Sequence, residues 1–200
     1  MDETPSNQQP NLPPENTLGA ALFKYRDYTP IPLILMILIF AEPTVTTAVL
    51  GLISVFLGEL TRVYSVAFIG SISRTRKDRT GGRLIKEGPF SFVRNPLYVG
   101  NFFITLGVAI FAGSSALVAL TVALFAFQYY FIVQYEEELL RKTFGQDYDD
   151  FCREVPAWFP KKRFEIEKLE WPSSFSAAIK SEQKTLMAIA FMIGSLCLLS

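Results

Sequence analysis

The chain has 200 residues, half of them hydrophobic, and its 19 basic and 19 acidic residues give a formal charge of zero. Balanced charge gives no support for a nucleic-acid partner, and the lack of histidine excludes histidine metal sites, histidine general bases and Ser-His or Cys-His nucleophiles. The composition favours an all-α polytopic membrane protein, a bundle of about five short transmembrane helices with cytoplasmic polar loops.

The chain begins with a segment that the sequence predicts to be unstructured. Residues 1–17 are polar and proline-rich, which predicts a disordered tail, and they show no signal-peptide pattern. Residues 18–29 mix large apolar side chains with basic ones, which suits a short helix lying in the membrane interface. This helix is expected to hold the tail at the membrane.

A membrane core is predicted over residues 30–160. Residues 31–41 are continuously apolar but would be only about 16 Å long as a helix, well short of a bilayer core of roughly 30 Å. The preferred interpretation is a helical hairpin that turns at Pro43 and returns through residues 45–70. The alternative is one helix kinked at Pro43.

Charged residues mark the far end of the second helix and the loop after it. Glu59 and Arg62 are three residues apart, so they can pair on one helix face. The loop at residues 71–95 is rich in basic side chains, and the positive-inside rule therefore places it in the cytoplasm. Its charged residues are Arg74, Arg76, Lys77, Arg79, Arg83, Lys86 and Arg94 against Asp78 and Glu87.

The third helix is predicted to begin at Pro96 and to end at Ala112. Proline suits a first helical turn, and the unpaired N–H groups there, with Arg94 beside them, would form an anion-binding corner at the membrane surface. The alternative is that Arg94 only obeys the positive-inside rule and Tyr98 only belongs to an interfacial aromatic belt. An uncharged outer turn at residues 113–115 follows.

The fourth helix is predicted to cross at residues 116–134 and to leave the membrane as an acidic segment. Three successive glutamates cannot share one helix face, because each residue advances about 100°. Glu136 continues the apolar stripe and should face the bundle, whereas Glu137 and Glu138 can pair with basic residues one turn on, Arg141 and Lys142.

Gly145 is predicted to end the fourth helix. The aromatic residues that follow should lie on the membrane surface, with Trp158 and Trp171 as interfacial anchors. Residues 161–184 are interpreted as an interfacial amphipathic segment, and residues 185–200 as a last transmembrane helix. The two cysteines are far apart and outside any C-x-x-C motif, which argues against a disulfide or a zinc cluster.

Taken together, GPFSFVRNPLYVG, a two-helix hairpin and YEEELLRKTFGQDYDDFCREVPAWFP resemble the integral-membrane methyltransferases that include isoprenylcysteine carboxyl methyltransferases and phospholipid N-methyltransferases. The likeness covers about residues 84–160. It implies that S-adenosylmethionine binds in a pocket facing the cytoplasm. The methyl acceptor would be a lipid or lipidated molecule from the bilayer, with an isoprenylcysteine-like carboxylate or a phospholipid head group. The membrane would be a bacterial inner membrane or the endoplasmic reticulum.

The resemblance also implies site residues. The catalytic set would be Arg94, Asn95 and Glu136, with no metal. The cofactor-binding set would be Gly88, Pro89, Arg94, Asn95, Pro96, Tyr98, Gly100, Glu136, Glu137 and Tyr148. Many relatives have R-H-P-x-Y where this chain has Asn95, so no imidazole is available for a proton-transfer role at this position. A cofactor with a sulfonium, an ammonium and a carboxylate needs acids and a cationic group, which Glu136, Glu137 and Arg94 would supply.

Two other functions fit parts of the pattern. An NADPH-dependent membrane reductase of the sterol or steroid type has a similar layout, but three glutamates serve a 2′-phosphate poorly. A non-catalytic helical membrane protein could use the basic loop to recruit anionic lipid. The enzymatic interpretation requires that the Arg94 turn and the glutamates of the fourth helix meet in space.

Overall fold

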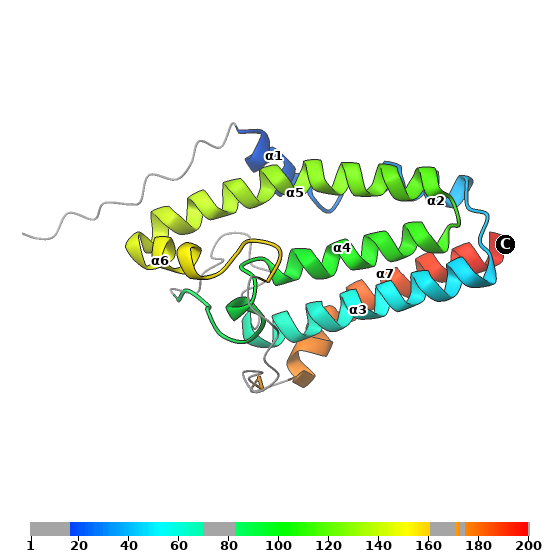
Figure 1. The fold of residues 1–200 in the computed structure, drawn as a ribbon. Coiled ribbons are helices and arrows are strands. Elements are labelled where there is room, and N and C mark those ends of the chain that lie inside the picture. Colours follow the sequence, from blue (N-terminus) through cyan, green and yellow to red (C-terminus); the bar gives the residue numbers. More distant parts are fainter. Residues whose placement is uncertain (1–16, 70–82, 161–170, 173–174, 200) are drawn as a thin grey trace, which may run out of the picture.

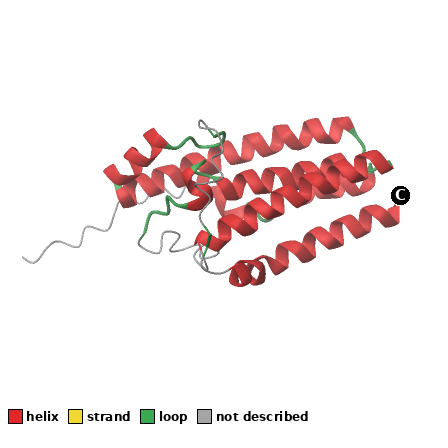
Figure 2. Ribbon diagram, turned by 60° about the horizontal axis from the view of Figure 1, so that its bottom comes forward, coloured by secondary structure: helices red, strands yellow, loops and turns green. Residues whose placement is uncertain are grey.

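The computed structural model describes residues 17–69, 83–160, 171–172 and 175–199 (Figure 1). Throughout these residues, the regular elements are helices joined by loops (Figure 2). In chain order they are α1 (Leu18–Tyr25), α2 (Ile31–Ile39), α3 (Val45–Ile69), the 3-10 helix η2 (Gly88–Ser91), α4 (Pro96–Phe111), α5 (Ser115–Phe144), α6 (Gln146–Glu154) and α7 (Phe175–Leu199). The predicted tail up to residue 16, the basic residues between 74 and 79 and residues 161–170 lie outside the described residues.

Local sequence signals set several helix ends, and those at Pro96 and Gly145 were predicted. The Thr17 hydroxyl accepts a hydrogen bond from the Ala20 N–H at 3.2 Å and caps α1. Pro96 is the first residue of α4. Gly145 ends α5 with a φ of 54°, a conformation that favours glycine, and its N–H donates to the Arg141 carbonyl at 2.8 Å.

The chain breaks between α2 and α3, which are separate helices and not one kinked helix. The connection, residues 40–44, is pinned to the end of α4, because the Glu42 N–H donates to the Ala112 carbonyl at 2.8 Å. Figure 1 shows the chain passing from α2 to the start of α3 at the right-hand end of the bundle. The predicted break at Pro43 is therefore confirmed.

Glycines let α3 and α4 pack at very short range. A Cβ atom on Gly51 would lie 2.6 Å from the Gly107 carbonyl oxygen, and one on Gly58 would lie 2.7 Å from the Gly100 carbonyl oxygen. A larger residue at either position would force the two helices apart, so glycine is favoured here. Close approach at small residues is typical of helices that pack within a membrane.

Two helices of the described residues, α3 and α5, are long and apolar enough to cross a membrane, and α4 is a shorter apolar helix. Large side chains on α3, among them Phe56, are exposed on its outer face, as expected next to lipid. The five predicted crossings are not all confirmed by this finding. One boundary was also wrong: α7 begins at Phe175, within the segment assigned to the interface, so the last helix includes Lys180, Glu182 and Lys184.

Candidate active site

The start of α4 and the charged end of α5 lie at the same end of the bundle, together with α6 (Figure 1). Two contacts join them. Arg94, just before α4, pairs with Glu137 of α5 at 2.6 Å, and the Tyr98 hydroxyl of α4 hydrogen-bonds to a Glu136 carboxylate oxygen. The juxtaposition that the sequence required is therefore present.

Arg94 is the hub of this junction. Its Nε and Nη2 donate to one oxygen of Glu137, and its Nη1 donates to the Cys152 carbonyl at 3.3 Å and to the Val155 carbonyl at 2.6 Å. Its backbone N–H donates to the Pro156 carbonyl. These bonds use most of the five N–H groups of a guanidinium. Burial opposes its charge, but the hydrogen bond and charge of Glu137 prevail and raise the pKa of Arg94.

The three glutamates differ in their partners, as their helix positions predicted. Glu136 faces the bundle and accepts from Tyr98, and Glu138 pairs with Lys142 at 2.9 Å. Glu137 differs from the prediction, since it pairs with Arg94. The helix-neighbour partner that the sequence offered it, Arg141, pairs instead with Asp149.

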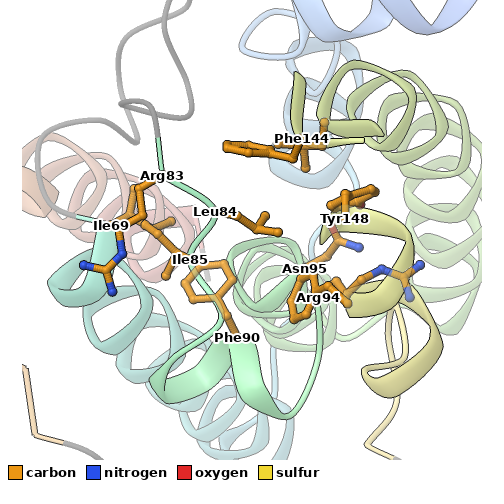
Figure 3. Close-up of a pocket in the computed structure, with 11 residues that line it drawn as sticks. Ile69, Arg83, Leu84, Ile85, Phe90, Arg94, Asn95, Phe144 and Tyr148 are labelled. Carbon is orange, nitrogen blue, oxygen red and sulfur yellow. The ribbon is translucent and has the colours of Figure 1, made fainter. Parts of the chain in front are cut away.

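A cavity of about 120 Å³ opens beside this junction (Figure 3). Its lining is mainly apolar and aromatic: Ile69, Arg83, Leu84, Ile85, Phe90, Arg94, Asn95, Leu140, Phe144, Tyr148 and Phe151. Figure 3 shows the stem of Arg94 beside the cavity, with the guanidinium directed away from Phe90. Arg94 thus contributes its stem to the wall while its charge holds Glu137 and the segment after α6.

Asn95 and Tyr148 are the other predicted site residues that line the cavity. The Asn95 amide donates to the Ala157 carbonyl at 3.3 Å, which leaves its own carbonyl oxygen as an acceptor. Tyr148 is buried, and burial followed by the charge of Glu137 raises the pKa of its hydroxyl. Tyr148 therefore stays neutral at physiological pH.

The other seven predicted cofactor residues do not line this cavity. Tyr98, Glu136 and Glu137 belong to the contacts that join α4 and α5. Gly88 and Pro89 are buried in η2, and Gly88 has a φ of 58°. Pro96 is buried at the start of α4. A Cβ on Gly100 would meet the Arg62 side chain at 2.6 Å, so this glycine is needed for helix packing. We leave Gly100 out of the proposed cofactor site.

Sequence reasoning missed the aromatic lining of the cavity. Phe90, Phe144 and Phe151 come from η2, α5 and α6, and 18 phenylalanines in the chain gave no signal to single these out. The one available signal was their place in the sequence. Phe90 directly follows the predicted break at Gly88-Pro89, and Phe144 and Phe151 lie on either side of the predicted break at Gly145.

Comparison with known families bears on the functions that the sequence left open. The phospholipid methyltransferase family matches residues 46–147, which run from the start of α3 into α6. The chain belongs to this family. The matched residues include Arg94, Asn95, Glu136 and Glu137, and membership supports the membrane methyltransferase class over the reductase and the non-catalytic protein.

Two proteins that are similar to this chain are named for metal resistance. The nickel-cobalt-cadmium resistance protein NccN of Alcaligenes xylosoxydans xylosoxydans is 28% identical over 144 residues, which are 72% of this chain and 62% of the relative. The cobalt-zinc-cadmium resistance protein CzcN of Cupriavidus metallidurans is 27% identical over 145 residues, with the same coverage. The chain thus spans less than two thirds of either relative. No solved structure gave a significant match.

Proposed function

We propose that this protein is an S-adenosylmethionine-dependent methyltransferase that transfers a methyl group to a lipid or lipidated acceptor at the cytoplasmic face of the membrane. The observation that carries the proposal is the junction of α4 and α5, where the Arg94–Glu137 and Tyr98–Glu136 contacts adjoin a cavity lined by aromatic side chains. Membership of the phospholipid methyltransferase family supports the reaction class.

The groups around the cavity fit the chemistry of this cofactor. An adenine ring needs flat apolar surfaces on its faces, and the rings of Phe90, Phe144 and Phe151 offer them. Its polar edge needs a hydrogen-bond partner, and the side-chain oxygen of Asn95 can accept such a bond. A cavity of about 120 Å³ is smaller than the roughly 300–1,000 Å³ of a site for a whole drug-sized ligand. The cavity therefore matches an adenine-sized part, and we propose that the remainder extends toward Glu136 and Glu137.

The cofactor supplies an activated methyl group on a positively charged sulfur. The carboxylates of Glu136 and Glu137 would offset that positive charge, with Tyr98 orienting the first and Arg94 the second. The apolar lining would exclude water, and a dry, well-oriented site is what an in-line displacement needs most. A carboxylate acceptor is already ionised at neutral pH, whereas an amine acceptor must first lose a proton.

The charges at the two ends of the bundle support the proposed orientation in the membrane. Arg83, Lys86 and Arg94 lie at the site end, and the turn at Gly113 on the opposite side carries no charge. By the positive-inside rule the site end would face the cytoplasm. We propose that α2, α4 and α7 cross the membrane with α3 and α5, which gives the five crossings expected from the sequence.

Calorimetry and a transfer assay test this function. The purified protein in detergent should bind S-adenosylmethionine. In lipid nanodiscs it should transfer a tritium-labelled methyl group either to phosphatidylethanolamine or to an added farnesylated cysteine. Glu136→Gln is expected to lower the transfer rate at least about tenfold, whereas Glu138→Gln, on the exposed side of the same helix, should not change it. Absence of cofactor binding, with no effect of Glu136→Gln, would overturn the proposal.

A further inference from the structure

A second set of polar side chains, buried or partly buried, lies among the helices beyond the cavity. Glu59 and Arg62 come from α3, Asn101 from α4, Tyr129 from α5 and Glu182 from α7. Glu182 is only 1% exposed and Glu59 only 8%. Buried charges in a membrane protein are costly, and they persist where they have a specific role.

These side chains form a continuous chain of contacts that ends at the proposed site. Glu182 accepts from Arg62 Nη2 at 2.6 Å, and Arg62 Nη1 donates to the Asn101 side-chain oxygen. The Asn101 amide nitrogen donates to the Tyr129 hydroxyl at 3.2 Å. The Tyr129 ring lies against the Tyr98 ring, with 4.7 Å between centroids, and Tyr98 in turn holds Glu136.

Two acids compete for Arg62, and they are not equivalent. The nearest oxygen of Glu59 lies 3.9 Å from Arg62 Nε, and neither Glu59 oxygen has a hydrogen-bond partner among the described residues. Glu182, by contrast, makes a short charge-assisted hydrogen bond. Glu182 therefore fixes the guanidinium in the orientation that also lets Nη1 reach Asn101.

We infer that Glu182 is a positioning residue for methyl transfer, acting through Arg62, Asn101 and Tyr129 on the Tyr98–Glu136 pair. The inference rests on the function proposed above. It also assigns a role to α7, which lies beyond the residues 46–147 matched by the family. Without Glu182, Arg62 turns toward Glu59, its Nη1 leaves Asn101, and the Tyr129 ring that packs on Tyr98 loses its anchor.

The test compares two buried glutamates in the 200-residue protein, in phosphatidylethanolamine nanodiscs with added farnesylated cysteine, so that both candidate acceptors are present. Glu182→Gln should lower kcat for transfer from tritium-labelled S-adenosylmethionine by about tenfold, because a small displacement of a reacting group costs that much. The dissociation constant for S-adenosylmethionine should stay within about twofold, since Glu182 does not line the cavity. Glu59→Gln changes the other acid beside Arg62, which makes no hydrogen bond to the guanidinium, so the kcat of this variant should match the wild type.

A double variant separates positioning from a purely structural role. Asn101→Leu breaks the same chain one step further on, so Glu182→Gln combined with Asn101→Leu should have the kcat of either single variant. Assays run well below the melting temperature of every variant remove the contribution of unfolding. Three results would each overturn the inference and leave the proposed function standing. They are a double variant whose loss of kcat is the product of the two single losses, an equal loss of kcat in Glu59→Gln, and an unchanged kcat in Glu182→Gln. A wild-type protein that binds no cofactor would overturn both.

Discussion

At the residue scale, Arg94 connects three parts of the chain, because its side chain holds Glu137 of α5 and the carbonyls of Cys152 and Val155. Arg94→Met would leave a partly buried carboxylate and two carbonyls without their donor. We expect a loss of about 3–5 kcal/mol in the free energy of unfolding. Glu137→Gln should cost less, about 1–3 kcal/mol, because Arg94 keeps its carbonyl partners. Denaturant unfolding in detergent measures both.

Glu138→Gln is the matched control for these variants. Glu138 makes an ion pair with Lys142, but its side chain is about half exposed, so its loss should change stability by only about 0–1 kcal/mol. If Arg94→Met unfolded no more readily than Glu138→Gln, Arg94 would not be the hub of this end of the bundle.

Tyr148 gives a prediction about pH. Burial, and then the charge of Glu137, raise the pKa of its hydroxyl above the usual value. The unfolded chain therefore loses this proton before the folded protein does, so the folded state loses stability as the pH rises through about 10. Tyr148→Phe removes this group, and the fall in Tm between about pH 9 and pH 11 should become shallower.

Tyr130→Phe is the control for the pH experiment, because Tyr130 is an exposed tyrosine on α5. The Tm of the Tyr130→Phe variant should fall with pH as steeply as that of the wild type. Parallel curves for Tyr148→Phe and the wild type would show that Tyr148 is not held neutral by its surroundings.

At the element scale, the glycines between α3 and α4 set how closely these helices approach. Gly51→Ala and Gly58→Ala each place a Cβ within 2.7 Å of backbone atoms of α4, so each should destabilise the protein by about 1–3 kcal/mol. Gly194→Ala in α7 is the control, because nothing lies within 4 Å of its Cβ. It should be neutral or stabilising by up to about 1 kcal/mol, since alanine favours a helix. Equal losses at all three positions would contradict close packing, and thermal unfolding in detergent measures them.

The same scale shows what the sequence could predict. The ends of α4 and α5 were predicted because proline, glycine and the change from apolar to charged residues are local signals. The partner of Glu137 and the start of α7 were not predicted. Helix periodicity places an acid on a face, but the helix that faces it is decided by tertiary packing. Glu182 lies in a charged stretch of sequence, and its burial depends on Arg62, more than a hundred residues away.

At the scale of the whole molecule, the meeting of the Arg94 turn with the α5 glutamates was predicted from complementary charge and from the family resemblance. The binding partners of Arg94 were not predicted. The sequence offered Arg94 as a ligand for an anion, whereas the structure directs its guanidinium to Glu137 and to the carbonyls of Cys152 in α6 and Val155 just after it. Those carbonyl groups have no sequence signature, because every residue carries one.

The two cysteines of the chain test the proposed topology without any engineered site. Cys152 is half-buried in α6 at the proposed cytoplasmic end, and Cys197 is exposed in the last turn of α7 at the opposite end (Figure 1). If α7 crosses the membrane as proposed, a membrane-impermeant maleimide should label Cys197 in intact cells. Cys152 should react only after permeabilisation.

The Cys152→Ser and Cys197→Ser variants assign each labelled band. Labelling of both cysteines from the same side would show that α7 does not cross. Labelling of Cys152 alone in intact cells would show that the topology is the reverse of the proposed one, with the proposed site outside the cytoplasm. Because the cell supplies S-adenosylmethionine on the cytoplasmic side, that second result would also remove the cofactor from reach of Glu136 and Glu137.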